Sequence, residues 1–343
     1  MTFFPFFVLY IGKISLAFQG SFNLRKPLSF CTCFAKQSFD TGDASLPNEG
    51  LWNQKKYPIG NPNTRSINGI EGSSVEDQNE WLDKAREAFR SKNFVHLPDI
   101  LPKAAFDLLL DEINSIPQSC HYRSPSVHNI LLADDIDPEH RSVEGDNTSE
   151  AEKRAKEIVT RLKQESRKSL IAYDQFGEKS ILCRFYNSEE LIRFVSFLVL
   201  DRKADEKIFR SGDEIGGAYV NIFHEADSLG WHFDRSRFFV NLILQNPAGG
   251  GEFEYTWKEN GCGSSPTFAE LEKVLTDKES ENESFVRKVP MKPGSLIIFC
   301  GSKAMHRVTP VTSNTPRINA IFTFEFEPDV VLNDYTRETF FGR

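Results

Sequence analysis

The strongest constraint on the fold is a series of short apolar segments between residues 218 and 328. In chain order these segments are AYVNIFH, GWHFD, FFVNLILQN, GEFEYTW, GSLIIFC and INAIFTFEFE. Turn-forming residues separate most of them, among them Asn246-Pro247, Gly249-Gly250-Gly251 and Lys292-Pro293-Gly294. Short apolar runs divided by Gly and Pro turns predict an all-β barrel or sandwich. We therefore expect residues 216–328 to form a β-barrel core.

The series is interrupted once, at residues 258–287. This insert contains an expected helix at 267–275, followed by a charged loop. A helix placed between two barrel strands lies outside the barrel, and from there it could cover the barrel mouth.

The chain before the barrel is predicted to be mainly helical, so residues 76–215 are expected to support the core. Helical spacing of apolar residues predicts helices at 75–91, 103–116, 150–172 and 188–200, with a short strand-like run at 93–98. Residues 41–75 have the composition of a linker or wrapping arm, and residues 329–343 are expected to be a C-terminal tail. The predicted class is α+β with a mainly β core.

The first forty residues differ in composition from the rest. An apolar stretch at 2–12 is too short to span a membrane, and basic residues follow it, while the first acidic residue is Asp40. This composition predicts a cleaved targeting segment at 1–40. The pair Ala17-Phe18 resembles the junction in the two-part plastid-targeting sequences of diatoms and related algae, which implies an organellar, plastid location. A secretory signal and a cytoplasmic location are the alternatives.

The net charge of −8 and a pI near 5.5 argue against a nucleic-acid partner, because such binding depends on Lys and Arg neutralising phosphates. The six cysteines show no paired spacing beyond one Cys-x-Cys, which argues against a disulfide framework or a zinc knuckle. We expect a small-molecule partner and no stable membrane anchor. The oligomeric state cannot be predicted.

The chemistry is concentrated in the segment Trp231-His232-Phe233-Asp234. Alternate side chains of a strand point to the same face, so His232 and Asp234 can bind one ion. A third ligand follows at His306, beyond a Pro-Gly turn and an apolar strand. Two imidazoles and one carboxylate form the facial triad of non-haem Fe(II) oxygenases, which leaves coordination positions free.

Arg317 comes eleven residues after His306 and opens the last strand. A guanidinium pairs bidentately with a carboxylate, so we expect Arg317 to bind the distal carboxylate of 2-oxoglutarate. Asn319 should share the face of Arg317 and add a hydrogen bond, and Thr309 is another polar candidate for the cosubstrate.

The stretch from residue 216 to residue 326 resembles the double-stranded β-helix core, a jelly-roll or cupin-like fold, of the Fe(II)/2-oxoglutarate-dependent dioxygenases. Within that superfamily, WHFDRSRFFVNLILQNPAGGGEFEY is similar to the group that halogenates or hydroxylates free amino acids. The resemblance implies Fe(II) as cofactor, 2-oxoglutarate as cosubstrate and O2 as oxidant. It also implies that His224, with Asn221, and the residue after the triad carboxylate contact the substrate.

Two residues refine the expected reaction. Halogenating members have a small residue at the carboxylate position, so Asp234 favours hydroxylation, oxidative cyclisation or desaturation. The residue after it is Arg235, a cation that would repel a lysine ammonium. We therefore expect a small amino-acid-like substrate with an anionic group. A protein or peptidyl hydroxylase, with the insert 258–287 recognising polypeptide, is an alternative, as is a non-catalytic metal-binding barrel.

Overall fold

The computed structural model describes residues 50–57, 59, 75–132, 149–200, 206–234, 236–256, 267–276 and 285–343. The chain divides into two compact units, Met1–Ala35 and Lys36–Arg343, and all the described residues belong to the second. The predicted targeting segment at 1–40 lies outside the described residues, as do most of the linker and residues 133–148.

The helices and helical turns are α1 (Val75–Lys92), α2 (Lys103–Ser115), η2 (Gln118–Cys120), α3 (Glu150–Arg161), η4 (Tyr173–Gln175), α4 (Ile181–Tyr186), α5 (Glu189–Val199), α6 (Phe268–Thr276), α7 (Asp334–Thr336) and η6 (Arg337–Phe341). The strands are β1 (Phe94–Leu97), β2 (Tyr122–His128), β3 (Gln164–Ile171), β4 (Phe209–Arg210), β5 (Ala218–Phe223), β6 (Leu229–His232), β7 (Phe239–Gln245), β8 (Phe253–Thr256), β9 (Val286–Lys288), β10 (Leu296–Phe299), β11 (His306–Val308), β12 (Arg317–Phe322) and β13 (Phe324–Glu325).

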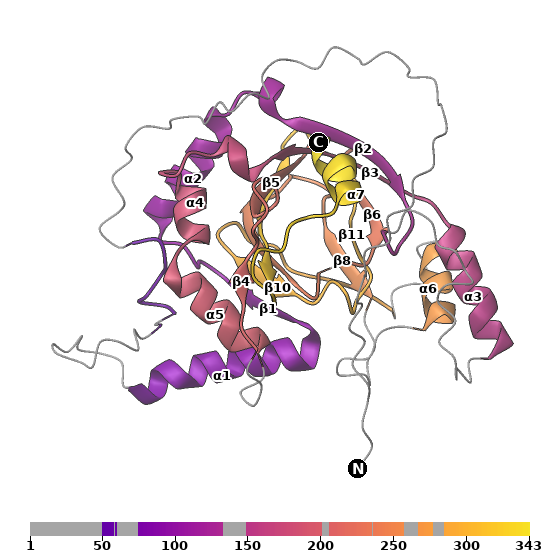
Figure 1. Cartoon of the computed structure of the whole chain (residues 1–343), viewed down its shortest axis with the longest axis horizontal. Coiled ribbons are helices and arrows are strands. Elements are labelled where there is room, and N and C mark those ends of the chain that lie inside the picture. Colours follow the sequence, from indigo (N-terminus) through magenta and orange to yellow (C-terminus); the bar gives the residue numbers. More distant parts are fainter. Residues whose placement is uncertain are drawn as a thin grey trace. The chain divides into compact units, whose positions relative to one another are not determined.

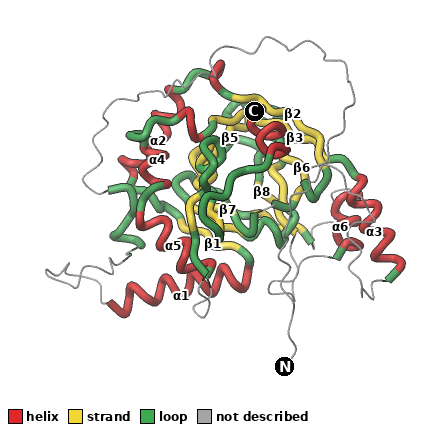
Figure 2. Tube along the Cα trace, in the orientation of Figure 1, coloured by secondary structure: helices red, strands yellow, loops and turns green. Residues whose placement is uncertain are grey.

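Two antiparallel sheets form the centre of the fold (Figures 1 and 2). The larger sheet has seven strands in the order β1-β10-β7-β12-β5-β3-β2, and the smaller has four in the order β6-β11-β8-β9. Strands that follow one another in sequence, such as β5 and β6 or β7 and β8, lie in different sheets. This alternation is that of a double-stranded β-helix, so the predicted fold class is confirmed.

The larger sheet also contains strands that precede residue 216. The expected single helix over 150–172 is wrong: α3 ends at Arg161, and β3 then pairs with β2 and β5. In β3 the side chains of Ser166 and Lys168 are buried while those of Glu165 and Arg167 are exposed. The free edge of β5 provides backbone hydrogen-bond partners, and these decide the strand conformation of a segment with mixed propensity.

The helices of the second unit pack outside the sheets. α1 lies against α5 and β1, as Figure 1 shows at its lower left. Trp52, in the part of the predicted arm that is described, is buried and stacks on Phe185 with 6.4 Å between ring centroids. Trp81 packs against both Phe194 and Tyr57. This part of the arm is therefore packed on the helical layer.

The helix of the insert, α6, packs on α3 through Val159, Leu271 and Val274 (Figure 1). None of its residues lines the central cavity described below. The described part of the insert therefore does not cover that cavity, and residues 257–266 and 277–284 lie outside the described residues.

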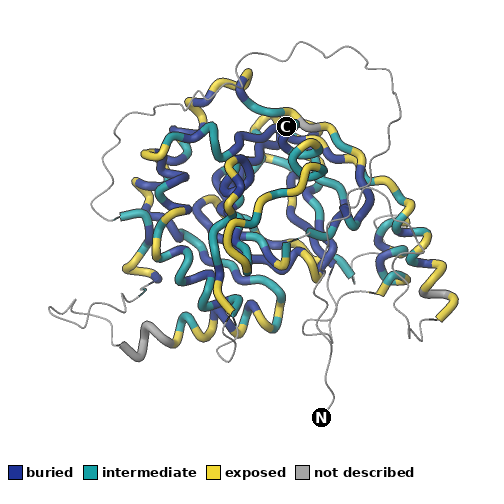
Figure 3. Tube along the Cα trace, viewed as in Figure 1, coloured by how far each residue is buried: buried dark blue, intermediate teal, exposed yellow. Residues whose placement is uncertain are grey.

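The C-terminal residues, predicted as a tail, contain α7 and η6. Phe341 is buried against Tyr219 of β5, with 5.2 Å between ring centroids. Gly342 follows with a φ of 73°, where an added Cβ would overlap the ring of Tyr122. Figure 3 shows the buried strands in dark blue beneath this segment. No helix among the described residues is long and apolar enough to cross a membrane.

Candidate metal centre and active-site cavity

The smaller sheet brings two histidines and one aspartate together. His232 ends β6, His306 begins β11, and the two are partners in the strand pairing. The Nε2 atom of His232 lies 3.6 Å from Oδ1 of Asp234, and that of His306 lies 3.5 Å from Oδ2. The possible ligand atoms of the three residues lie within 4.8 Å of one another. Sequence analysis predicted these three residues as metal ligands, and the structure brings them together.

Both imidazoles are fixed with the same nitrogen free. Nδ1 of His232 lies 2.8 Å from the carbonyl oxygen of Gly230, and Nδ1 of His306 lies 3.0 Å from that of Ala304. A carbonyl oxygen can only accept, so each Nδ1 carries the proton and donates it. Each Nε2 is then left with the lone pair that a metal ion requires.

Asp234 is held ionised beside these rings. Burial opposes its ionisation, but the nearby imidazoles of His306 and His232 outweigh that effect and lower the pKa of the carboxyl. Burial, followed by the neighbouring His306, lowers the pKa of His232, which favours its neutral form. Oδ2 of Asp234 is buried with no hydrogen-bond partner among the described residues. Two imidazoles and an ionised carboxylate with an unused oxygen form a donor set that fits a divalent cation.

Three aromatic rings pack around the imidazole of His306. Its ring lies 5.6 Å from that of Phe239, 5.4 Å from that of Phe253 and 5.2 Å from that of Phe299, measured between centroids. The ring of His128 lies 6.0 Å from that of His232, measured between centroids. Its two ring nitrogens are within hydrogen-bond distance of Ser166 and the carbonyl of Asn129. It therefore packs beside the ligand set and does not belong to it.

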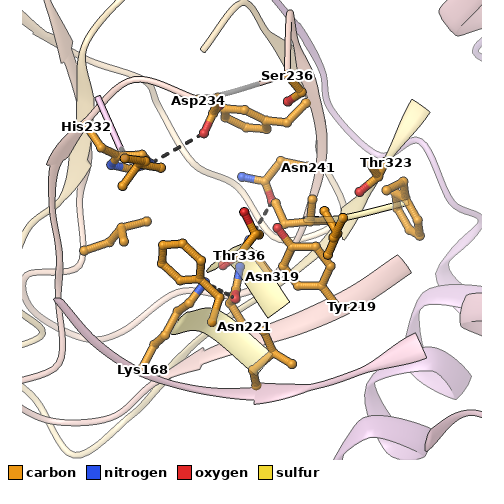
Figure 4. Close-up of a pocket in the computed structure, with 18 of the residues that line it drawn as sticks. Lys168, Tyr219, Asn221, His232, Asp234, Ser236, Asn241, Asn319, Thr323 and Thr336 are labelled. Carbon is orange, nitrogen blue, oxygen red and sulfur yellow. Dashed lines mark hydrogen bonds and ion pairs between the residues drawn. The ribbon is translucent and has the colours of Figure 1, made fainter. Parts of the chain in front are cut away.

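A cavity of about 370 Å³ lies between the two sheets and contains this triad. Its walls come from β3, β5, β7 and β12 of the larger sheet, from β6, β8 and β11 of the smaller one, and from the C-terminal segment. Figure 4 shows His232 and Asp234 on one side, with Lys168 and Asn221 across the cavity. The volume is typical of small-molecule sites, which span about 300–1,000 Å³.

Arg317 reaches this cavity from β12 and is 1 % exposed. Its Nε and one terminal nitrogen, Nη1, have no hydrogen-bond partner among the described residues. Burial lowers the pKa of the guanidinium to about 10. A buried cation without a counter-charge is costly unless a ligand supplies one. Its surroundings therefore suit the carboxylate of a bound molecule.

The other predicted site residues divide into two groups. Asn319 and Asn221 line the cavity; Asn319 donates to Asn241 at 2.9 Å, and its own Oδ1 is buried without a partner in the described part of the chain. Thr309 and His224 are not cavity-lining residues. The hydroxyl of Thr309 accepts the backbone N–H of Glu252 at 2.9 Å.

His224 follows the end of β5, where its backbone N–H donates to Asp227 at 2.9 Å. The cavity lining therefore includes neither Thr309, the predicted cosubstrate contact, nor His224, the predicted substrate contact. Arg235, predicted to contact the substrate, lies outside the described residues.

Several residues that line the cavity were not predicted from the sequence. Lys168 was placed in a charged helix, and Tyr219 and Asn241 were assigned no role beyond their strands. The C-terminal residues Leu332 and Phe340 also line the cavity. The segment QESRKSLI begins with six polar residues and shows no apolar alternation, so it carries no signal that Lys168 turns inward.

The model of one protein family, described as Halogenase D, matches residues 142–340, which is more than half of the chain. The chain therefore belongs to the Halogenase D family. The match includes all three triad residues and Arg317. The predicted superfamily, that of the Fe(II)/2-oxoglutarate oxygenases with its halogenase and hydroxylase group, is confirmed.

No curated protein matches the chain. Among solved structures, it is similar to a 2OG-Fe(II) oxygenase-family oxidoreductase from Burkholderia pseudomallei, at 14 % identity over 77 % of this chain and 96 % of that one, with a TM-score of 0.42. It is also similar to EctD from S. alaskensis, solved with 2-oxoglutarate and 5-hydroxyectoine, at 16 % identity over 77 % and 80 %, with a TM-score of 0.41.

A third similar structure is a prolyl hydroxylase from Trichoplax adhaerens, solved with a hypoxia inducible factor peptide. The identity is 13 % over 74 % of this chain and 94 % of that one, and the TM-score is 0.43. EctD is thus solved with small molecules, and the prolyl hydroxylase with a peptide. Similarity at this level does not select a substrate.

Proposed function

We propose that this chain is an Fe(II)/2-oxoglutarate-dependent oxygenase that hydroxylates, or oxidatively cyclises or desaturates, a small amino-acid-like substrate with an anionic group. One observation carries the proposal: a His-Asp-His triad and a buried arginine without a counter-charge share one cavity. The triad suits a divalent metal ion, and Arg317 suits the carboxylate of a cosubstrate.

His232, Asp234 and His306 would hold Fe(II), because two neutral imidazoles and one carboxylate are the ligand set of non-haem iron oxygenases. When bound, Fe(II) with 2-oxoglutarate and O2 supplies the oxidising power needed to break an unactivated C–H bond. The hydrogen bonds from the two Nδ1 atoms keep the imidazole rings in place for that task.

Arg317 would orient the cosubstrate by binding its distal carboxylate, which would also give the guanidinium the counter-charge that it lacks. Asn319, two residues along the same strand, also lines this cavity, and its unpartnered Oδ1 would accept a hydrogen bond from a donor group of a bound molecule. Phe239 and Phe253 line the cavity next to His306 and keep bulk water from the triad. Arg317 thus binds and orients the cosubstrate, and Phe239 and Phe253 exclude water.

Asp234 favours oxygenation over halogenation within this family. A halide that binds the metal needs the coordination position that a carboxylate would otherwise occupy. Here Gly301 makes room for that carboxylate, because an added Cβ at residue 301 would lie 1.7 Å from Oδ2 of Asp234. The space beside the metal is thus filled by a protein ligand.

A small substrate fits the cavity better than a polypeptide. The cavity lies between the sheets, and residues of the C-terminal segment, among them Leu332 and Phe340, form part of its wall. The described helix of the insert packs on α3 and not beside this cavity. Of the insert that was expected to recognise a polypeptide, the described helix is therefore not at the site.

The test combines a substrate screen with one variant. The enzyme is supplied with Fe(II), 2-oxoglutarate and O2 and offered free amino acids, their N-substituted derivatives and proline-containing peptides. Mass spectrometry then records a gain of one oxygen or a loss of two hydrogens. We expect a product from an amino-acid derivative with an extra anionic group, and succinate in equal amount.

Asp234→Ala should abolish that turnover, whereas Glu225→Ala, which removes an exposed acid from the β5–β6 turn, should leave it unchanged. Full activity of the Asp234 variant would contradict the triad assignment. Products from peptides alone would instead favour the peptidyl hydroxylase. Failure of the wild-type protein to bind metal or turn over any compound would favour a non-catalytic barrel.

A further inference from the structure

We infer that Lys168 binds a carboxylate of the substrate and is therefore a specificity-determining residue of this site. The inference rests on the proposed function and adds the residue that selects for the anionic group. It depends on three features of Lys168: where β3 places it, what surrounds its ammonium group, and how it is separated from Arg317.

β3 turns Lys168 into the cavity. Successive side chains of this strand point to opposite faces of the sheet. Lys168 is buried; Arg167 before it is exposed, and Ser169 after it is buried as well. Its residue exposure is only 6 %, although lysine is among the residues least often buried. Lys168 lines the same cavity as the triad (Figure 4).

The surroundings of the Lys168 ammonium are polar and aromatic but not anionic. Nζ donates to Oδ1 of Asn221 at 2.8 Å. It also lies 5.8 Å from the ring centroid of Tyr219 and 5.5 Å from that of Phe340. No ion pair joins it to a carboxylate within the part of the chain that the structure describes.

This arrangement leaves a cation that needs a ligand. A buried ammonium is stable when paired, and two ring faces with one amide oxygen supply less than a full counter-charge. Burial accordingly lowers the pKa of Lys168 to about 8, against a smaller opposing effect of Asp234. A carboxylate entering the cavity would supply the missing charge and accept the remaining N–H groups.

Lys168 and Arg317 are separate cation sites. β3 and β12 lie on opposite sides of β5 in the larger sheet, so the two side chains enter the cavity from different strands. Two cations on opposite sides of one strand can bind two carboxylates. If Arg317 binds the cosubstrate, Lys168 is available for the substrate.

The cavity wall next to Lys168 also defines what the carboxylate is attached to. Leu170, Leu332 and Phe340 line the cavity with apolar surface. An apolar chain attached to the carboxylate would bury against them. Hexanoate and hexanamide are therefore suitable probes, since they differ in the charge of one end and share the apolar chain.

The experiment measures the affinities of both probes by calorimetry under anaerobic conditions, with the full chain loaded with Fe(II) and 2-oxoglutarate. The proteins are the wild type, Lys168→Met, and the control Lys163→Met, which changes an exposed lysine just before β3. We expect hexanoate to bind the wild type and the control at least about tenfold more tightly than hexanamide. In Lys168→Met this ratio should fall to about one, because the charge that distinguishes the probes is gone.

Two further measurements separate this inference from the proposed function. The affinity for 2-oxoglutarate should stay within about twofold in Lys168→Met and should be lost in Arg317→Met. An acylating reagent should label Lys168 in the metal-free protein, and hexanoate should protect it more than hexanamide. Loss of 2-oxoglutarate binding in the wild type would sink the proposed function alone, since the labelling still tests Lys168.

The inference is overturned if the wild type shows no preference for hexanoate. It is overturned also if that preference survives in Lys168→Met, or if Lys168→Met loses 2-oxoglutarate rather than hexanoate. If the methionine variant does not fold, Lys168→Gln serves in its place, because its amide N–H can still donate to Asn221.

Discussion

Replacing Gly301 by alanine is expected to disable the metal centre while leaving the fold intact. Gly301 follows β10, and its carbonyl accepts the backbone N–H of Asp234 at 3.1 Å. Its φ does not lie in the left-handed region, so alanine is compatible with the backbone. The new methyl group therefore acts through its contact with the carboxylate of Asp234.

The size of the effect follows from two distances. An alanine Cβ at position 301 would lie 1.7 Å from Oδ2 of Asp234, whereas real Cβ contacts are at least 3.0 Å, so the oxygen has to move by 3.0 − 1.7 = 1.3 Å or more. Metal–ligand distances tolerate only about ±0.2 Å. The Cγ and Cβ atoms of Asp234 would lie 2.5 and 2.9 Å from the new methyl group, so the side chain has to turn about its Cα–Cβ bond and its Cβ has to shift slightly. We expect metal affinity to fall at least about 100-fold.

Calorimetric titration with Co²⁺ under anaerobic conditions measures that affinity, and thermal unfolding with and without the ion gives an independent readout. An ion that binds the native state alone raises the midpoint of unfolding, so wild type should gain stability and Gly301→Ala should gain none. Lys303→Ala, which changes an exposed side chain in the same turn, should behave as wild type. Wild-type affinity in Gly301→Ala would refute the assignment of Asp234 as a ligand.

Three further perturbations have defined outcomes. Arg317→Met should raise the free energy of unfolding of the metal-free protein at pH 7 by about 2 kcal/mol, as measured by urea denaturation, because it removes a buried cation whose folded-state pKa is below its unfolded value. Hexanoate binding to wild type should weaken as pH rises above about 8, because Lys168 then loses its proton. The two neighbouring groups do not change in this range: Tyr219, whose pKa is raised by burial, stays neutral, and Asp234 stays ionised. Trp52→Ala should lower the free energy of unfolding by about 3–5 kcal/mol, because it leaves a cavity between Phe185 and Phe194.

Each of these expectations can fail in a specific way. Lower stability of Arg317→Met would mean that the guanidinium has a counter-charge in the protein. For Lys168, the depressed pKa also predicts that stability relative to Lys168→Met rises between pH 8 and the unfolded-state pKa, since the folded protein releases its proton first. If the affinity for hexanoate does not change from pH 7 to pH 9.5, Lys168 does not bind its carboxylate. Unchanged stability of Trp52→Ala would show that the arm does not pack as described.

The ligand set could be predicted from the sequence because the rule that governs it is local. Two residues separated by one position in a strand share a face, which holds for His232 and Asp234 whatever surrounds them. The same rule placed Arg317 and Asn319 together in the cavity wall. It did not extend to Thr309, which lies just past the end of β11 and bonds to the backbone of a neighbouring segment.

The error over 150–172 has a different cause. The charged composition of this stretch is compatible with a helix, and its first half is one, α3. The second half becomes β3 because β2 and β5 offer strand partners on both sides. Those partners are distant in sequence, so a local pattern does not reveal them.

The sequence by itself determined the strands of the barrel, the three metal-ligand candidates and the arginine, because periodicity and turn residues act over a few neighbouring positions. The tertiary structure alone decided that Lys168 is buried without a counter-charge beside this triad. Burial and the absence of an anionic partner depend on side chains such as Tyr219 and Phe340, which come from distant parts of the chain. The electrostatic environment of a group is set by everything that packs around it, and the chain fixes that only when it folds.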